Sequence, residues 1–165
     1  MDPLAPEEEV IWRALLRIVF FLPKALDEDL VRDAGVTLTE YTVLMNLSEA
    51  AGQQLRLTDL AASTGLSVSR ISRLVDEFCE RRYVTKRRSA VDGREAIAAL
   101  SSEGMRTLER AYPAHLRSVR HWVVDHLGGG GKREYPRLAL PDMADSLSHT
   151  AHRTPPMRAD SDGRP

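Results

Sequence analysis

Cysteine is almost absent from this chain of 165 residues, in which Cys79 is the only one. A single thiol excludes an internal disulfide framework and a cysteine-based zinc site. No apolar run comes close to the length of about 20 residues that a membrane-spanning helix needs. The acidic start MDPLAPEEEV also lacks the basic residues of a secretory signal. We therefore expect a cytoplasmic protein that does not contact a membrane.

Signatures of catalysis, cofactor binding and metal binding are lacking as well. The sequence contains neither a glycine-rich phosphate-binding loop nor the G-x-S-x-G turn of serine hydrolases. The histidines His115, His121 and His126 are spaced by six and five residues. At about 100° per residue they do not share one face of a helix and cannot chelate one metal ion. The sequence therefore predicts a protein that is not an enzyme and that holds no cofactor or metal.

Basic residues are not in excess overall, because the net charge is −1. Their distribution is uneven, since residues 1–50 carry a net charge of −6 whereas residues 67–94 carry +4. Physiological salt screens charges beyond about 8 Å, so a DNA phosphate would respond mainly to the nearby basic segment. The charge distribution therefore favours DNA as a partner, with a solvated charged surface as the alternative.

A helix-turn-helix pattern lies between Thr58 and Arg82. The first helix is expected to begin at Thr58 as its N-cap and to run through Thr64, where Gly65 supplies the left-handed residue that ends it. Ser67 then caps a second helix, in which apolar residues recur every three or four positions and gather on one face. These residues are Val68, Ile71, Leu74, Val75 and Phe78. The opposite face is polar and suits the major groove of DNA. It carries Ser69, Arg70, Ser72 and Arg73.

A strand-like pattern follows from Tyr83 to Leu100, with Asp92-Gly93 as the signal for a turn between two short strands. A two-stranded hairpin directly after a recognition helix is a wing, and cations around its tip suit phosphates or a minor groove. The cationic side chains of this wing are Lys86, Arg87, Arg88 and Arg94. Residues 55–57 are expected to add a short third strand beside it.

These segments resemble the multiple-antibiotic-resistance regulator (MarR) family of bacterial winged-helix repressors. The resemblance covers roughly residues 10–127 and is carried by two dipeptides, by the run SVSRISRLVDEF and by a wing signature. The dipeptides are Leu60-Ala61 and Gly65-Leu66, the run is Ser67 to Phe78, and the signature is Asp92-Gly93-Arg94 followed by Leu100-Ser101 and Gly104. The resemblance implies a mainly α fold with a small β-hairpin wing, a winged helix-turn-helix with N- and C-terminal dimerisation helices. Arg82 departs from the pattern, because family members often have glycine there.

The organisation of the chain follows from this resemblance and from the helical periodicities. Residues 1–35 are expected to form an N-terminal dimerisation helix, apolar over much of its circumference and kinked or divided at Pro23. Residues 36–100 would form the DNA-binding lobe, whose first helix opens at Thr39. Residues 101–150 would hold a long helix capped by Ser101 and a short C-terminal helix for dimerisation, and residues 151–165 a disordered tail.

The function that the residues and the resemblance predict is that of a homodimeric transcriptional regulator, by resemblance a repressor, that binds double-stranded DNA and joins the nucleoid when bound. Its target is expected to be a pseudo-palindrome with half-site centres about 34 Å apart. The predicted DNA-binding residues are Ser67, Ser69, Arg70, Ser72, Arg73, Lys86, Arg87, Arg88, Asp92 and Arg94. The alternative for Arg70 and Arg73 is ion pairing with Asp76 and Glu77 on the same helix. For Asp92 it is a purely structural role in the turn.

A small aromatic or anionic effector is a further partner that the resemblance implies, because family members often release DNA when such a ligand enters a crevice beside the DNA-binding lobe. By resemblance, the crevice would be lined by Trp12, Arg13, Leu16, Arg17, Tyr41, Met45 and His115. Ordinary core packing is the alternative for Trp12, Tyr41 and Met45.

Two other functions remain open at this point. A winged helix can serve as a protein-interaction module with no DNA target, which predicts that duplex DNA stays unbound even at low salt. The protein could also sense oxidants through Cys79, which requires an accessible thiol with a lowered pKa rather than a buried free thiol.

Overall fold

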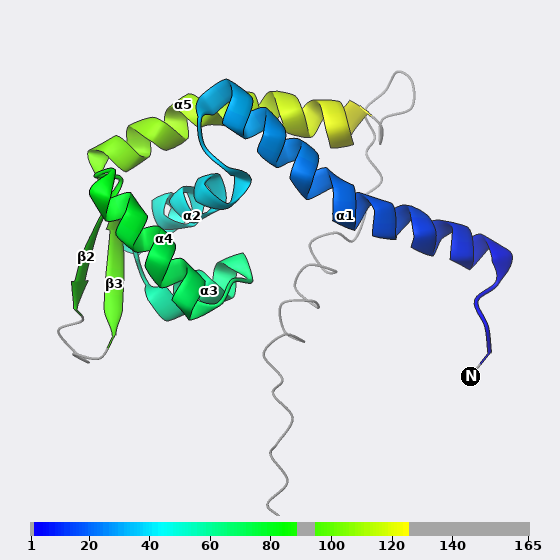
Figure 1. The fold of residues 1–165 in the computed structure, drawn as a ribbon, viewed down its shortest axis with the longest axis horizontal. Helices are drawn as coiled ribbons and strands as arrows, with labels where there is room; N and C mark the ends of the chain where they lie inside the picture. Colours follow the sequence, from blue (N-terminus) through cyan, green and yellow to red (C-terminus); the bar gives the residue numbers. More distant parts are fainter. Residues whose placement is uncertain (1, 89–94, 126–165) are drawn as a thin grey trace, which may run out of the picture. The chain divides into compact units, whose positions relative to one another are not determined.

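The structure, a computed structural model, describes residues 2–88 and 95–125. It confirms a mainly helical fold with a small antiparallel sheet (Figure 1). The elements are α1 (Pro6–Ala34), α2 (Leu38–Glu49), the 3-10 turn η1 (Ala51–Gln53), β1 (Gln54–Arg56), α3 (Leu57–Thr64), α4 (Val68–Glu80), β2 (Val84–Arg88), β3 (Ala96–Leu100), α5 (Ser102–Val119) and the π-helical turn η2 (Arg120–Val124). Within these described ranges, no helix is long and apolar enough to cross a membrane.

Helices α3 and α4 form the predicted helix-turn-helix. Gly65 ends α3 with a φ of 69°, in the left-handed region that glycine adopts without strain. Ser67 caps α4 by accepting a hydrogen bond from the backbone N–H of Arg70. The predicted cap at Thr58 is wrong, because α3 begins one residue earlier and Arg56 is its N-cap. The chain passes from β1 into α3 without an intervening loop, so Thr58 already lies inside the helix and cannot cap it.

The apolar face of α4 is fully buried at three of its five predicted positions. Ile71, Val75 and Phe78 are fully buried, and Leu74 is partly buried against the same core. The prediction for Val68 is wrong, because 47% of this residue is exposed. Val68 is the first residue of α4, and the described elements leave that end of the face uncovered.

The sheet has the strand order β1-β3-β2, and both pairings are antiparallel. The predicted third strand is present as β1, one residue earlier than expected, with Arg56 opposite Ile97. Strands β2 and β3 form the hairpin of the wing, with Val84 opposite Leu100 at its base. The connection 89–94 lies outside the described residues, and with it the predicted Asp92-Gly93 turn.

Helix α1 is continuous from Pro6 to Ala34, so Pro23 does not divide it. Proline removes one backbone hydrogen bond, and Pro23 lies at an exposed position where water can satisfy the freed carbonyl. Helix α2 begins at Leu38 rather than at Thr39. Its N-cap Thr37 and Glu40 form a reciprocal capping box, which satisfies two backbone N–H groups.

Helix α5 begins as predicted at the cap Ser101, whose hydroxyl oxygen accepts a hydrogen bond from the Gly104 N–H at 3.0 Å. It passes through Pro113 and continues as the π-helical turn η2. The description stops at Asp125, so the predicted C-terminal helix and the tail 151–165 lie outside the described residues.

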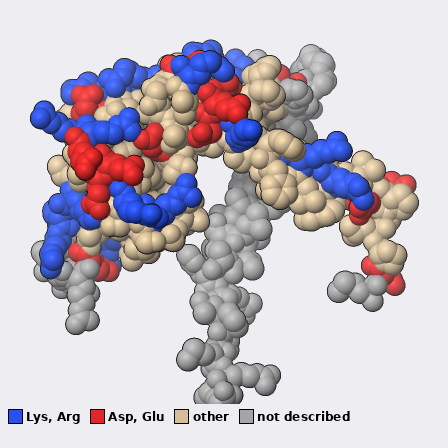
Figure 2. Space-filling view, viewed as in Figure 1, with Lys and Arg blue, Asp and Glu red and all other residues tan. Residues whose placement is uncertain are grey.

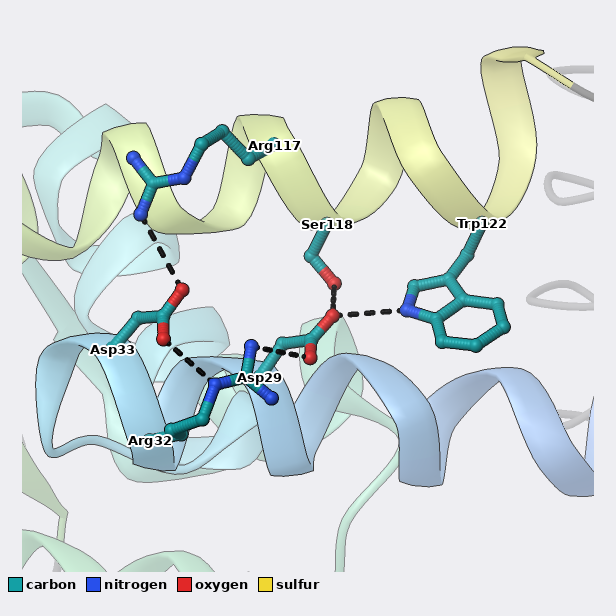
Figure 3. Close-up of polar contacts among 6 residues, drawn as sticks. All are labelled: Asp29, Arg32, Asp33, Arg117, Ser118 and Trp122. Carbon is teal, nitrogen blue, oxygen red and sulfur yellow. Dashed lines mark hydrogen bonds and ion pairs between the residues drawn. The ribbon is translucent and has the colours of Figure 1, made fainter.

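The second half of α1 is fixed to the end of α5 by a polar cluster centred on Asp29 (Figure 3). The Asp29 carboxylate accepts hydrogen bonds from the Ser118 hydroxyl at 2.5 Å and from the Trp122 indole at 2.9 Å. Arg32 donates to it at 2.7 Å from within α1. These donors, Ser118 first, lower the pKa of Asp29 from its ordinary 3.8 to about 2. Asp33 extends the cluster by pairing with Arg32.

Candidate nucleic-acid interface

The front of α4 presents an exposed polar surface. Ser67, Ser69, Arg70 and Arg73 are all exposed, whereas Ile71 on the opposite face is fully buried. The helix therefore has one face fixed by the core and the other exposed, as its periodicity predicted. An arginine on such a face can bond guanine O6 and N7 as a bidentate pair.

Arg70 and Arg73 line a groove of about 560 Å³ between α4 and the region where α1 gives way to α2. The groove is also lined by Asp27, Thr37, Thr39, Glu40, Leu74 and Glu77. In the described residues, neither arginine forms an ion pair with Asp76 or Glu77. The guanidinium groups are therefore not held along their own helix by those two carboxylates.

The cationic side chains of the wing strand differ in their surroundings. Lys86 contacts α4, where it donates to Ser72 at 3.1 Å and to Asp76 at 2.7 Å. Arg87 donates to the side-chain oxygen of Gln54 in β1 at 2.8 Å. Arg88, at the end of β2, is exposed. Asp92 and Arg94 lie outside the described residues, so their predicted roles stay predictions.

The basic surface of the lobe is visible in Figure 2, where blue side chains gather over the sheet and α4, with red side chains interspersed. Three of the predicted DNA-binding residues, Ser69, Arg70 and Arg73, lie exposed on α4. Two others, Ser72 and Lys86, are brought together by a mutual hydrogen bond. No local pattern predicts this contact, because the two residues lie on separate elements.

The C-terminal end of α4 is held by Arg81, a residue that the sequence analysis did not assign. Its guanidinium forms an ion pair with Glu40 of α2 and lies over the Tyr83 ring, 4.5 Å from the ring centroid. The next residue, Arg82, has a φ of 60°, so the chain turns into β2 through a left-handed residue that is not glycine. Arg82 stands where family members often have glycine, and its left-handed φ strains the backbone.

Cys79 is half-buried on α4 and packs against the core. Burial raises the pKa of its thiol, and the negative charge of Asp76 adds to the effect. A raised pKa lowers the fraction of reactive thiolate at neutral pH. The geometry therefore favours the buried free thiol over the oxidant sensor.

Among the described residues, those predicted to line an effector crevice lie in two separate places. Tyr41 and His115 stack in the core with ring centroids 4.4 Å apart, and Met45 packs against the same core. Burial lowers the pKa of His115. Trp12, Arg13 and half-buried Leu16 lie instead on the first half of α1, where Arg13 pairs with Glu9.

Arg17 lines a separate apolar hollow of about 340 Å³ between α1 and the turn η2. Its other lining residues are Ile18, Phe21, Leu22, Ala25, Trp122 and Val123. Much of the apolar surface of α1 is exposed around it, and in Figure 2 this helix is largely tan with a band of blue. The exposed large apolar residues of α1 between its start and Phe21 are Val10, Ile11, Trp12, Leu15, Ile18, Val19, Phe20 and Phe21.

The chain is similar over most of its length to proteins of one family. It is 30% identical to Sco3205 from Streptomyces coelicolor, a MarR family transcriptional regulator solved in complex with DNA. The match covers 90% of this chain and 89% of that one, with a TM-score of 0.71. The chain belongs to the MarR family. The profile of this family matches residues 34–95, which hold α2, β1, the helix-turn-helix and the first wing strand β2.

Two other relatives add to this assignment. CouR from Rhodococcus jostii RHA1, solved bound to p-coumaroyl-CoA, is 27% identical over 87% of this chain and 93% of its own, with a TM-score of 0.66. The HTH-type transcriptional repressor YetL from Bacillus subtilis (strain 168) is 27% identical over 114 residues, which are 69% of this chain and 67% of that protein. As a MarR family member, the protein is a DNA-binding transcriptional regulator and not an enzyme, which confirms both predictions.

Proposed function

We propose that the protein acts as a homodimeric repressor, in which two copies present α4 and the wing to a pseudo-palindromic duplex operator. The observation that carries this proposal is the exposed face of α4, with Ser69, Arg70 and Arg73 set opposite a fully buried apolar face. Arginine and serine side chains on such a helix can reach base edges and phosphates in the major groove. The DNA complex of Sco3205 and the repressor YetL support the same assignment.

The exposed apolar surface of α1 supports the homodimer. Phe20 is 71% exposed and Phe21 is 68% exposed, and both lie on a helix that projects from the lobe (Figure 1). A monomeric protein rarely exposes so continuous an apolar surface, because burying apolar surface stabilises a protein by about 25 cal/mol per Å². A second copy of the same helix would cover it and would place two α4 helices about 34 Å apart on one face of the DNA.

The experiment is a gel-shift titration and footprint on the duplex upstream of the protein's own gene. Wild type should protect a pseudo-palindrome, and its affinity should fall steeply with salt. Arg73→Ala should weaken specific binding about 5- to 150-fold, since one bidentate arginine is worth about 1–3 kcal/mol of discrimination. Arg106→Ala removes the same charge from an exposed site on α5 and serves as the control. A protein-interaction module would instead leave this duplex unbound even at low salt.

We further propose that a small aromatic anion regulates DNA binding from the hollow beside Arg17. The hollow combines the aromatic side chains of Phe21 and Trp122 with a single cationic residue, which suits an apolar body with an anionic group. A relative, CouR, has been solved with an aromatic acyl-CoA.

Hydroxybenzoates, hydroxycinnamates and their CoA thioesters are the probes to test this effector. A ligand in the hollow should change the fluorescence of Trp122 and weaken operator binding. Arg17→Leu should remove both responses while leaving ligand-free operator affinity within about twofold. A response that survives Arg17→Leu unchanged would place the effector elsewhere, in the separate set around Tyr41 and His115.

A further inference from the structure

The Lys86 ammonium joins the wing to the recognition helix α4. It is the donor in two hydrogen bonds, to the Asp76 carboxylate at 2.7 Å and to the Ser72 hydroxyl at 3.1 Å. The Lys86 side chain is only 27% exposed, whereas that of Asp76 is 59% exposed. The lysine side chain therefore lies against α4 for much of its surface.

The two acceptors lie one helical turn apart, so they share one face of α4 and contact the same ammonium. Lys86 is the central residue of β2, the strand that packs on α4 and leads to the wing tip. A contact at this point resists both sliding and tilting of the hairpin along the helix. Because α4 and the wing belong to one DNA-binding unit, their relative orientation decides whether both can reach the duplex together.

We propose that Asp76 is a positioning residue for DNA binding, which holds Lys86 and thereby fixes the wing relative to α4. The proposal rests on the proposed function in that α4 and the wing bind the duplex. Asp76 acts here through Lys86 and not by touching DNA. Lys86, predicted from the sequence as a phosphate contact, has its main role in this bridge.

Charge alone predicts the opposite behaviour for Asp76. A carboxylate on a DNA-facing helix repels phosphates, so its removal should strengthen binding if it has no other role. If Asp76 positions the wing, its removal should weaken binding in spite of the more favourable charge. The sign of the change in affinity therefore separates the two roles.

Cys79 provides a measurement of the same contact without DNA. It lies three residues after Asp76 on α4, is half-buried, and its thiol feels the charges of both Asp76 and Lys86. It is the only cysteine of the chain, so alkylation reports on this site alone. Loss of the bridge should allow β2 to move away from α4 and should expose the thiol.

The test compares Asp76→Ala and Lys86→Met with the control Glu80→Ala, which removes an exposed carboxylate from the last turn of the same helix. The probe is the duplex upstream of the protein's own gene, titrated at several salt concentrations. Asp76→Ala and Lys86→Met should each weaken binding about three- to tenfold, and the double variant should be no weaker than either single one. Glu80→Ala should bind as tightly as wild type or more tightly. Asp76→Glu retains a carboxylate and should keep most of the wild-type affinity. This result would show that the weaker binding of Asp76→Ala does not come from misfolding.

The salt dependence and the thiol complete the test. The slope of affinity against salt should be unchanged in Lys86→Met, because a lost phosphate contact would reduce it by about one. Alkylation of Cys79 by iodoacetamide should be at least about threefold faster in both bridge variants. Tighter binding by Asp76→Ala, a reduced slope in Lys86→Met, or unchanged alkylation would each overturn the proposal. Failure of wild type to bind any duplex would refute the proposed function, and the alkylation rates would still decide whether the bridge holds β2 to α4.

Discussion

The indole Nε1 of Trp122 donates a hydrogen bond to the carboxylate of Asp29, which lies 93 positions earlier in the chain (Figure 3). Asp29 is on the half of α1 that enters the core through Leu30, and Trp122 is on the turn η2 that continues α5. The contact therefore holds the second half of α1 against the turn that continues α5. If these helices hold the proposed dimer together, this contact would help to set the distance between the two α4 helices.

Replacement of Asp29 by Asn should destabilise the protein by about 1–2 kcal/mol at pH 7, a figure reduced for the partial exposure of the side chain. The folded-state pKa of Asp29 is about 2, below its ordinary 3.8. Its contribution is therefore fully present well above pH 3.8 and is lost as the pH falls through about 2. Urea unfolding of wild type and Asp29→Asn should differ far less at pH 2 than at pH 7. An equal difference at both pH values would contradict the assignment.

Replacement of Arg82 by Gly should stabilise the protein by about 0.5–1 kcal/mol. A left-handed φ of 60° costs an arginine about 1 kcal/mol that glycine avoids, partly offset by the greater freedom of glycine in the unfolded chain. Gly65→Ala is the converse control, because a Cβ there meets nothing within 4 Å and the loss comes from φ alone. Thermal melts of the two variants should shift in opposite directions, and shifts in the same direction would refute the strain.

Gly104 is the site where an added methyl group should cost most. A Cβ at this position would overlap the carbonyl oxygen of Tyr83 and lie 2.7 Å from Cδ1 of Leu100. Gly104→Ala should therefore destabilise the protein by about 2–3 kcal/mol, since the backbone of Tyr83 cannot easily move. Ser102→Ala in the same helical turn is exposed and should change stability by less than about 0.5 kcal/mol. Denaturant midpoints measure both, and a midpoint of Gly104→Ala near that of wild type would show that α5 can shift.

A charge in the exposed apolar surface of α1 should prevent dimerisation. Phe20→Glu places a carboxylate where a second copy is proposed to bind, and should raise the dimer dissociation constant at least about 30-fold. Operator binding should fall with it, because one α4 helix alone binds weakly. Ser102→Glu, which adds the same charge at an exposed site on α5, is the control. Light scattering coupled to chromatography gives the mass, and a Phe20→Glu protein that is still dimeric would move the interface away from this surface.

Local features of this protein were determined by the sequence alone. The left-handed Gly65 and the caps Ser67 and Ser101 depend on hydrogen bonds and φ values within a few residues, and all three are as predicted. Arg82 stood out only through the resemblance, as a departure from the glycine of the family, and its left-handed φ of 60° came from the structure. The run from Ser67 to Phe78 and the wing pattern were enough to indicate the family.

Only the tertiary structure decided which side chains meet across elements. Periodicity sets the direction of Val68 on α4, but burial also needs a neighbouring element, and none in the described residues covers that turn. Lys86 was predicted from its charge to face DNA, yet its contact with Asp76 depends on how β2 packs on α4. The bond between Asp29 and Trp122 joins residues too far apart for any local pattern to reveal. Hydrogen bonds of this kind follow from the packing of whole helices, which the spacing of residues along one helix does not specify.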